Sequence, residues 1–295
     1  MALFVLLPFV SLAQSKFNRF FTPSDSLNIS RRNTIIVTEA SLSALTIVGL
    51  DQLWYADYDR SRFHVVNDND QWLQMDKLGH MFTSYQLGRH GAQLLNWSGV
   101  QKKDQLIYGA TLGFTFLTAV EVLDGYSKEW GFSWGDVLAN GAGTGLYIGQ
   151  ELLWNEQRIA VKYSFHETKF AQHNPDKLGK SFLEQVLKDY NGQTYWLSFN
   201  LHSFFKNSNI PKWLNIAVGY GADGMLYGSK DIDNQVLTNI DRYRQFYLSF
   251  DVNLNKIKTN SKLLMTIFDV FNMIKIPFPA LEISKKGPVF HLFFI

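Results

Sequence analysis

The chain has 295 residues, enough for one large domain or two smaller ones. It is 46% hydrophobic and 15% aromatic but only 18% charged, which argues against disorder and predicts much apolar surface in a core or against lipid. A net charge of +2 without a basic block argues against nucleic acid as a partner. The absence of cysteine excludes disulfides, thiolate metal sites, cysteine nucleophiles and a lipid-modified N-terminal cysteine.

The first segment has the pattern of a secretory signal peptide. Residues 2–13 form an apolar stretch that ends in small residues before Gln14, although a basic start is missing, so the true start would lie upstream of Met1. The alternative is a buried helix or strand. We expect a signal peptide over 1–13, export to the cell envelope, and an extended polar lead-in over 14–33.

A helical module is expected over residues 34–155. Apolar runs of helical length predict four helices, at 34–55, 76–96, 103–124 and 133–154. Each run is long enough to cross a bilayer, but acidic residues interrupt them, so plain lipid-facing spans are not expected.

Two of these helices are rich in glycine. The residues concerned are Gly109 and Gly113 in the third helix, and Gly141, Gly145 and Gly149 in the fourth. Each interior glycine costs roughly 1 kcal/mol of helix stability relative to alanine, so five of them need a reason. A spacing of four places them on one stripe, which predicts close helix–helix packing.

Polar residues recur in pairs at helical spacing. The pairs are Asp76 with His80, Glu121 with Asp124, and Asp136 with Asn140. In an antiparallel bundle the start of the second helix, the end of the third and the start of the fourth would meet at one end, together with Lys77. Ser133, three residues before Asp136, approximates a capping box, and Asp76 is placed to cap the second helix.

This grouping allows three interpretations. Carboxylates beside a histidine bind a divalent metal or perform acid–base catalysis, and the catalytic candidates are His80, Asp76, Glu121, Asp124 and Asp136. In a structural network, Lys77, Ser133 and Asn140 would instead join these residues in satisfying one another's hydrogen bonds. A partner-binding site is the third interpretation. The sequence contains no nucleophile elbow, His-Glu-x-x-His motif or phosphate loop.

The motif Asp76-Lys77-x-x-His80, followed by Ser133-x-x-Asp136-x-x-x-Asn140, resembles two families. It is similar to the helical motif of VanZ-like proteins and to the uncharacterised YfiM-like predicted periplasmic lipoproteins, including longer exported relatives in Bacteroidetes. The resemblance covers about residues 70–155. It implies an envelope location and a helical architecture, but no reaction, and without cysteine a lipid anchor does not carry over.

The second half, residues 156–295, changes to period-2 alternation and predicts an antiparallel β module. The expected strands are 158–166, 195–204, 213–221, 244–254, 278–284 and 288–295, with a further strand considered at 62–66. Helices are expected between strands, at 176–190 and 262–275.

Strands of about ten residues with one apolar face are typical of outer-membrane barrels, but a soluble sheet packed on the helices gives the same alternation. We therefore expect an α+β protein with a sheet or partial barrel. The leading functional hypothesis is a non-enzymatic envelope scaffold at the outer membrane, with lipid and an envelope protein as partners. The alternatives are an enzyme acting on lipid or glycan, and transport of a small apolar ligand. No cofactor is expected beyond a divalent metal at the His80 cluster.

Overall fold

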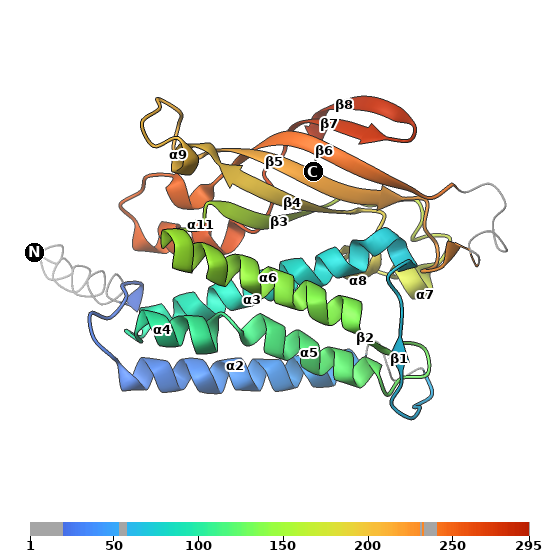
Figure 1. The fold of residues 1–295 in the computed structure, drawn as a ribbon, viewed down its shortest axis with the longest axis horizontal. Coiled ribbons are helices and arrows are strands. Elements are labelled where there is room, and N and C mark those ends of the chain that lie inside the picture. The colour runs from blue at the N-terminus through green and yellow to red at the C-terminus, as the bar shows by residue number, and fades with distance from the viewer. Residues whose placement is uncertain (1–19, 53–57, 231, 233–240, 295) are drawn as a thin grey trace, which may run out of the picture.

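A computed structural model describes residues 20–52, 58–230, 232 and 241–294, and places a helical bundle beside one antiparallel sheet (Figure 1). The expected signal peptide, 1–13, lies outside these residues. The main helices are α2 (Ile29–Leu50), α3 (Met75–Trp97), α4 (Lys102–Asp104), η3 (Gln105–Gly109), α5 (Leu112–Asp124) and α6 (Trp134–Trp154). The strands of the sheet are β3 (Ile159–Phe165), β4 (Gln193–Asn200), β5 (Leu214–Asp223), β6 (Tyr243–Val252), β7 (Phe278–Ser284) and β8 (Gly287–Phe294). The α+β class is confirmed.

The bundle follows the expected helices with shifted ends. α2 begins at Ile29, five residues before its expected start, because the Asn28 side chain accepts from the backbone N–H of Arg31 and caps it. The expected third helix consists of α4, the π-helical η3 and α5. α6 begins as expected, with the Ser133 hydroxyl accepting from the backbone N–H of Asp136.

The glycines pack as expected in only part of the bundle. A Cβ at Gly109 or Gly113 would collide with the backbone of α3, so these two residues do permit close helix contact. The prediction is wrong for the stripe on α6. Among the described residues no neighbouring atom lies within 4 Å of the Cβ position at Gly145 or Gly149, and Gly141 makes only an ordinary contact. The close approach on α6 occurs instead at Gly143, one face away, against Met81.

The six strands of the sheet lie in sequence order from β3 to β8, all antiparallel. All six strands expected from the alternation are present. Among the described residues the sheet is open, with β3 and β8 at its edges. The strand considered at 62–66 is wrong for this sheet: β1 (Val65–Val66) pairs only with β2 (Phe132–Ser133), in parallel. Short helices α7 (Pro175–Leu178), α8 (Phe182–Lys188), α9 (Leu201–Phe204) and α11 (Lys262–Phe271) and the turns η2 (Gln71–Gln74) and η4 (Leu254–Lys256) complete the fold.

The sheet curls strongly. The Phe294 ring at the end of β8 lies 5.8 Å from Trp196 on β4 and 4.4 Å from Tyr247 on β6. In a flat sheet β4 and β8 would be about 19 Å apart, four spacings of about 4.8 Å. These three rings therefore lie inside the curve, where they form one buried cluster with Ala217 and Ala280.

Beside this aromatic cluster, the concave face of the sheet also buries polar and charged residues. Lys162 and Asp251 are both fully buried, and their charged atoms lie 2.8 Å apart. The Ser198 hydroxyl donates to the same carboxylate at 2.6 Å, and Asn215 donates to Ser198 at 2.7 Å. The Lys275 ammonium lies 4.9 Å from the Trp196 ring centroid on this side.

The convex face is apolar. One row of paired residues crosses all six strands on this face: Val161, Leu197, Val218, Leu248, Leu281 and Phe290. At β3 and β4 the row packs against α3 and α6, with Val161 in the core cluster that includes Tyr85. From β5 onward no described element covers it, and its residues are 37–64% exposed.

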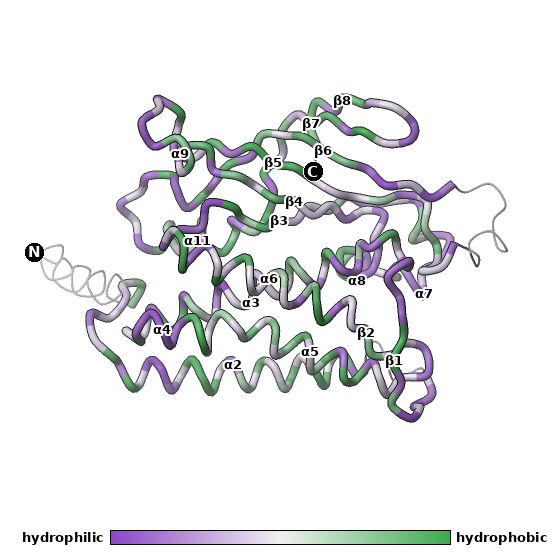
Figure 2. Tube along the Cα trace, viewed as in Figure 1, coloured by the Kyte–Doolittle hydropathy of each residue, from purple (hydrophilic) through white to green (hydrophobic). Residues whose placement is uncertain are grey.

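The outer side of the bundle is also apolar. α2 and α5 carry apolar residues along their lengths (Figure 2), and α2 exposes Val37, Leu45 and Val48. By length and composition alone, the helices Ile29–Leu50 and Lys102–Asp124 would reach across a membrane.

Candidate functional site

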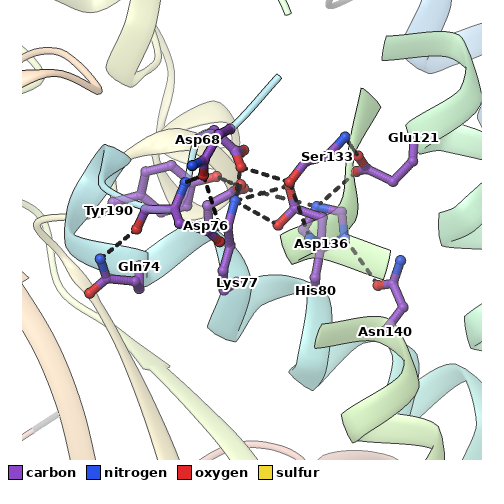
Figure 3. Close-up of polar contacts among 12 residues, drawn as sticks. Asp68, Gln74, Asp76, Lys77, His80, Glu121, Ser133, Asp136, Asn140 and Tyr190 are labelled. Atoms are coloured by element: carbon purple, nitrogen blue, oxygen red, sulfur yellow. Dashed lines mark hydrogen bonds and ion pairs between the residues drawn. The ribbon is translucent and has the colours of Figure 1, made fainter. Parts of the chain in front are cut away.

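A cluster of charged and polar side chains joins the start of α3, the end of α5 and the start of α6 (Figure 3). The helices meet there as the sequence predicts for an antiparallel bundle. The cluster contains Asp68, Asp76, Lys77, His80, Glu121, Ser133, Asp136 and Asn140, with Tyr190 from the β half. Most of these side chains are buried or largely buried.

The Lys77 ammonium is the central cation of the cluster. It lies 2.7 Å from a carboxylate oxygen of Asp68, 3.0 Å from Asp136 and 3.5 Å from Asp76. Burial alone would lower the pKa of Lys77, but the charges of Asp76 and Asp136 outweigh it and raise that pKa above its usual value. Burial likewise opposes ionisation of Asp68, but hydrogen bonds from Lys77 and Ser133 outweigh it and lower the pKa of Asp68.

His80 lies between an amide and a buried acid. Its Nδ1 is 3.0 Å from Oδ1 of Asn140, and its Nε2 is 3.5 Å from Oε1 of Glu121. The other oxygen of Glu121 accepts from the backbone N–H of Ser133 at 3.1 Å. If Nδ1–H donates to Asn140, Nε2 is an acceptor, and a protonated Glu121 is the donor that would satisfy it.

Two carboxyls of the cluster have strongly perturbed titration. Burial, reinforced by the charges of Asp136 and Asp124, raises the pKa of Glu121 to about 9. Burial and the charge of Asp76 raise the pKa of Asp136 to about 7, although His80 and Lys77 oppose the shift. Glu121 is therefore a neutral acid at pH 7, and Asp124 acts on the cluster through its charge.

Three residues have the geometry for a metal ion. Candidate ligand atoms of Asp76, His80 and Asp136 all lie within 4.8 Å of one another, and two carboxylates with one imidazole form a reasonable set for a divalent cation. The Lys77 ammonium competes directly for two of these carboxylates. The donor set therefore fits a metal only if Lys77 moves aside or shares the carboxylates with it.

Asp76 does not cap its helix, contrary to the sequence prediction. α3 begins at Met75, after a left-handed run over Trp72, Leu73 and Gln74. Gln74 holds the cap position, but its side chain makes no hydrogen bond that caps the helix. Asp76 lies in the first turn, where its negative charge interacts favourably with the helix dipole. Its carboxylate accepts a 2.7 Å hydrogen bond from the Tyr190 hydroxyl.

Sequence reasoning missed two members of the cluster. Asp68 lies in an irregular segment without periodicity, although a run of asparagine and aspartate there signals polar loop chemistry. Tyr190 is 114 residues from its partner Asp76, and no local pattern connects them. The cluster is therefore assembled from both halves of the chain, which argues that it fixes one half against the other.

A family profile described as "Predicted periplasmic lipoprotein (DUF2279)" matches residues 66–149. No curated protein and no solved structure matches the chain. The matched segment contains every member of the cluster except Tyr190 and excludes the sheet. The resemblance to uncharacterised periplasmic lipoproteins is confirmed over this segment, and the cell-envelope location expected from the sequence agrees with it. The likeness to YfiM, to VanZ-like proteins and to Bacteroidetes relatives stays a prediction.

Proposed function

We propose that the protein is a non-enzymatic envelope scaffold seated against the outer membrane through the convex face of its sheet. The observation that carries this proposal is the inverted polarity of the sheet. A soluble sheet buries its apolar face and hydrates its polar face, whereas β5 to β8 bury asparagine, serine, aspartate and glutamate and expose phenylalanine, leucine and isoleucine. Outer-membrane strands have this arrangement, with apolar residues toward lipid and polar residues inward.

The dimensions and borders of the apolar face also support lipid as its partner. On β6 the apolar residues of this face run from Phe246 to Val252, about 20 Å at about 3.4 Å per residue, against a roughly 25 Å apolar band in outer-membrane strands. Charged residues lie at both ends of the strands. Arg244 and Lys285 lie at one end, and Lys212 lies just before β5 at the other.

The polar cluster supports the non-enzymatic part of the proposal. Lys77 pairs with the carboxylates of Asp68, Asp76 and Asp136, and Tyr190 bonds the cluster to the β half, as expected of a network that fixes the two modules. The competing hypothesis is an enzyme acting on lipid or glycan. It is favoured by the raised pKa of Glu121 beside His80, because perturbed acids are common in active sites.

Vesicle flotation of the purified full chain tests the membrane part. We expect the protein to float with lipid vesicles, and the double variant Leu248→Glu/Ile283→Glu to remain largely unbound because two charges on the convex face would enter hydrocarbon. Leu183→Glu, on a 74% exposed residue of α8, is the matched control and should float as the wild type does. Equal flotation of the double variant would contradict the proposal.

Metal analysis combined with His80→Ala and Asp136→Ala tests the enzymatic alternative. The scaffold hypothesis predicts metal-free protein, and variants that keep cellular function in proportion to their remaining folded fraction. A stoichiometric metal that both variants lose, together with loss of function in well-folded protein, would favour the enzyme.

A further inference from the structure

A polar groove runs along one side of α3, far from the cluster at its first turn. Gln86, Arg89, Gln93 and Asn96 follow one another at spacings of three, four and three, so they form a single stripe on the helix. This stripe lines two adjoining cavities at the seam between the bundle and the β half.

The first cavity encloses about 210 Å³ between α3, β3 and the segment around η4. The second is a more open hollow of about 560 Å³ between α3, η3 and α6, and this volume is within the range of ligand pockets, which is roughly 300–1,000 Å³. Gln93 and Gln157 line both cavities, so the two lie side by side along the stripe and together make up the groove.

The groove is lined mainly by carboxamides. Six asparagine and glutamine side chains line the first cavity and five line the second, and since two are shared the total is nine. Several of them already bond within the protein, as Gln86 does to Val161 and Gln157 does to Tyr147. A carboxamide has two donor hydrogens and an accepting oxygen and carries no charge, so a side chain bonded at one end, such as Asn96 or Gln105, keeps its other end for a ligand. Tyr85 and Tyr147 add an aromatic ring to each cavity, 6.0 Å apart.

The charged side chains of the groove are already paired. Arg89 lies 2.7 Å from Asp269, Lys256 lies 2.7 Å from Glu156, and Lys102 pairs with Glu151. A charged ligand would find no spare counter-charge there and would lose its hydration at a cost. The lining therefore favours a ligand that is neutral and rich in groups that both donate and accept.

We propose that this groove binds an uncharged oligosaccharide. Sugar hydroxyls and acetamido groups match the donors and acceptors of the carboxamides, and the length of the stripe suits a ligand of several sugar units rather than one. The site is separate from the His80 cluster and does not depend on the membrane contact proposed above.

The test is a binding titration of the full chain in a detergent without a sugar headgroup, followed by calorimetry and by saturation transfer to the ligand. The probes are triacetylchitotriose and cellotriose, both uncharged, and trigalacturonate, which is anionic and of similar size. We expect at least one neutral trisaccharide to bind with a dissociation constant of about 1 mM or lower, and the anionic one to bind at least about tenfold more weakly.

Two variants locate the site. Gln93→Leu removes a side chain shared by both cavities, and Asn255→Ala removes an exposed amide, so each should weaken binding about tenfold through a lost hydrogen bond. Gln172→Leu, an exposed position outside the groove, is the matched control and should bind normally. The proposal is overturned if neither neutral probe saturates, if the anionic probe binds equally well, or if both groove variants bind like the control.

Discussion

Glu121→Gln should remove a pH dependence from the stability of the fold. Glu121 is 2% exposed, and burial raises its pKa to about 9 from a usual value of 4.5. The folded state therefore keeps a proton that the unfolded chain releases above pH 4.5. The contribution of Glu121 to stability is complete below pH 4.5 and is lost progressively as the pH rises toward 9.

The size of this loss follows from the shift. Between pH 4.5 and 7.5 the interval is about 3 units, which at 1.36 kcal/mol per unit corresponds to at most about 4 kcal/mol. A glutamine has the shape of a protonated glutamate and does not titrate. Its oxygen can accept from the Ser133 N–H while its amide donates to Nε2 of His80, so both contacts of Glu121 are kept.

Denaturant unfolding of the full chain at pH 5, 6, 7 and 8 measures the effect. We expect the stability of Glu121→Gln relative to wild type to rise steadily across this series. Glu167→Gln, at an exposed position, controls for the general loss of a carboxylate and should follow the wild type. A constant difference between Glu121→Gln and wild type at all four pH values would refute the neutral-acid assignment.

Two further predictions concern packing. Gly143→Ala should destabilise the protein by about 1–3 kcal/mol, because its Cβ would collide with the Met81 carbonyl oxygen. Gly145→Ala should be neutral or should stabilise the protein by up to about 1 kcal/mol. Thermal unfolding of both variants measures the difference, and equal effects would contradict the close approach at Gly143. Lys162→Met should lower the free energy of unfolding, measured with denaturant, by about 3–5 kcal/mol, because it leaves Asp251 buried without its cation. A decrease below about 1 kcal/mol would show that this pair is hydrated.

The sequence predicted the elements well because their periodicity is local. The change from helical to alternating pattern located both halves, all six strands of the sheet and the capping of α6 by Ser133. It also predicted that Asp76, Glu121 and Asp136 would meet, since short connections between long helices leave few arrangements.

The sequence failed where the answer depends on which face meets a neighbour. A stripe at Gly141, Gly145 and Gly149 marks a helix side that can pack closely, but not whether another helix lies against it. The same limit applies to the sheet, whose alternation cannot tell an apolar face turned inward from one turned outward. Only the pairing of strands and the position of α3 reveal that the convex face is uncovered beyond β4.

Contact between the convex face and lipid is the central claim, and the chain is convenient for testing it because it contains no cysteine. Spin labels at Leu248→Cys and Phe290→Cys, in protein bound to vesicles, should be readily reached by oxygen and poorly reached by a water-soluble nickel complex. A label at Asn207→Cys, in an exposed turn after α9, should show the reverse. If the labels on Leu248→Cys and Phe290→Cys are as accessible to nickel as the label on Asn207→Cys, the convex face is in water and the account is wrong.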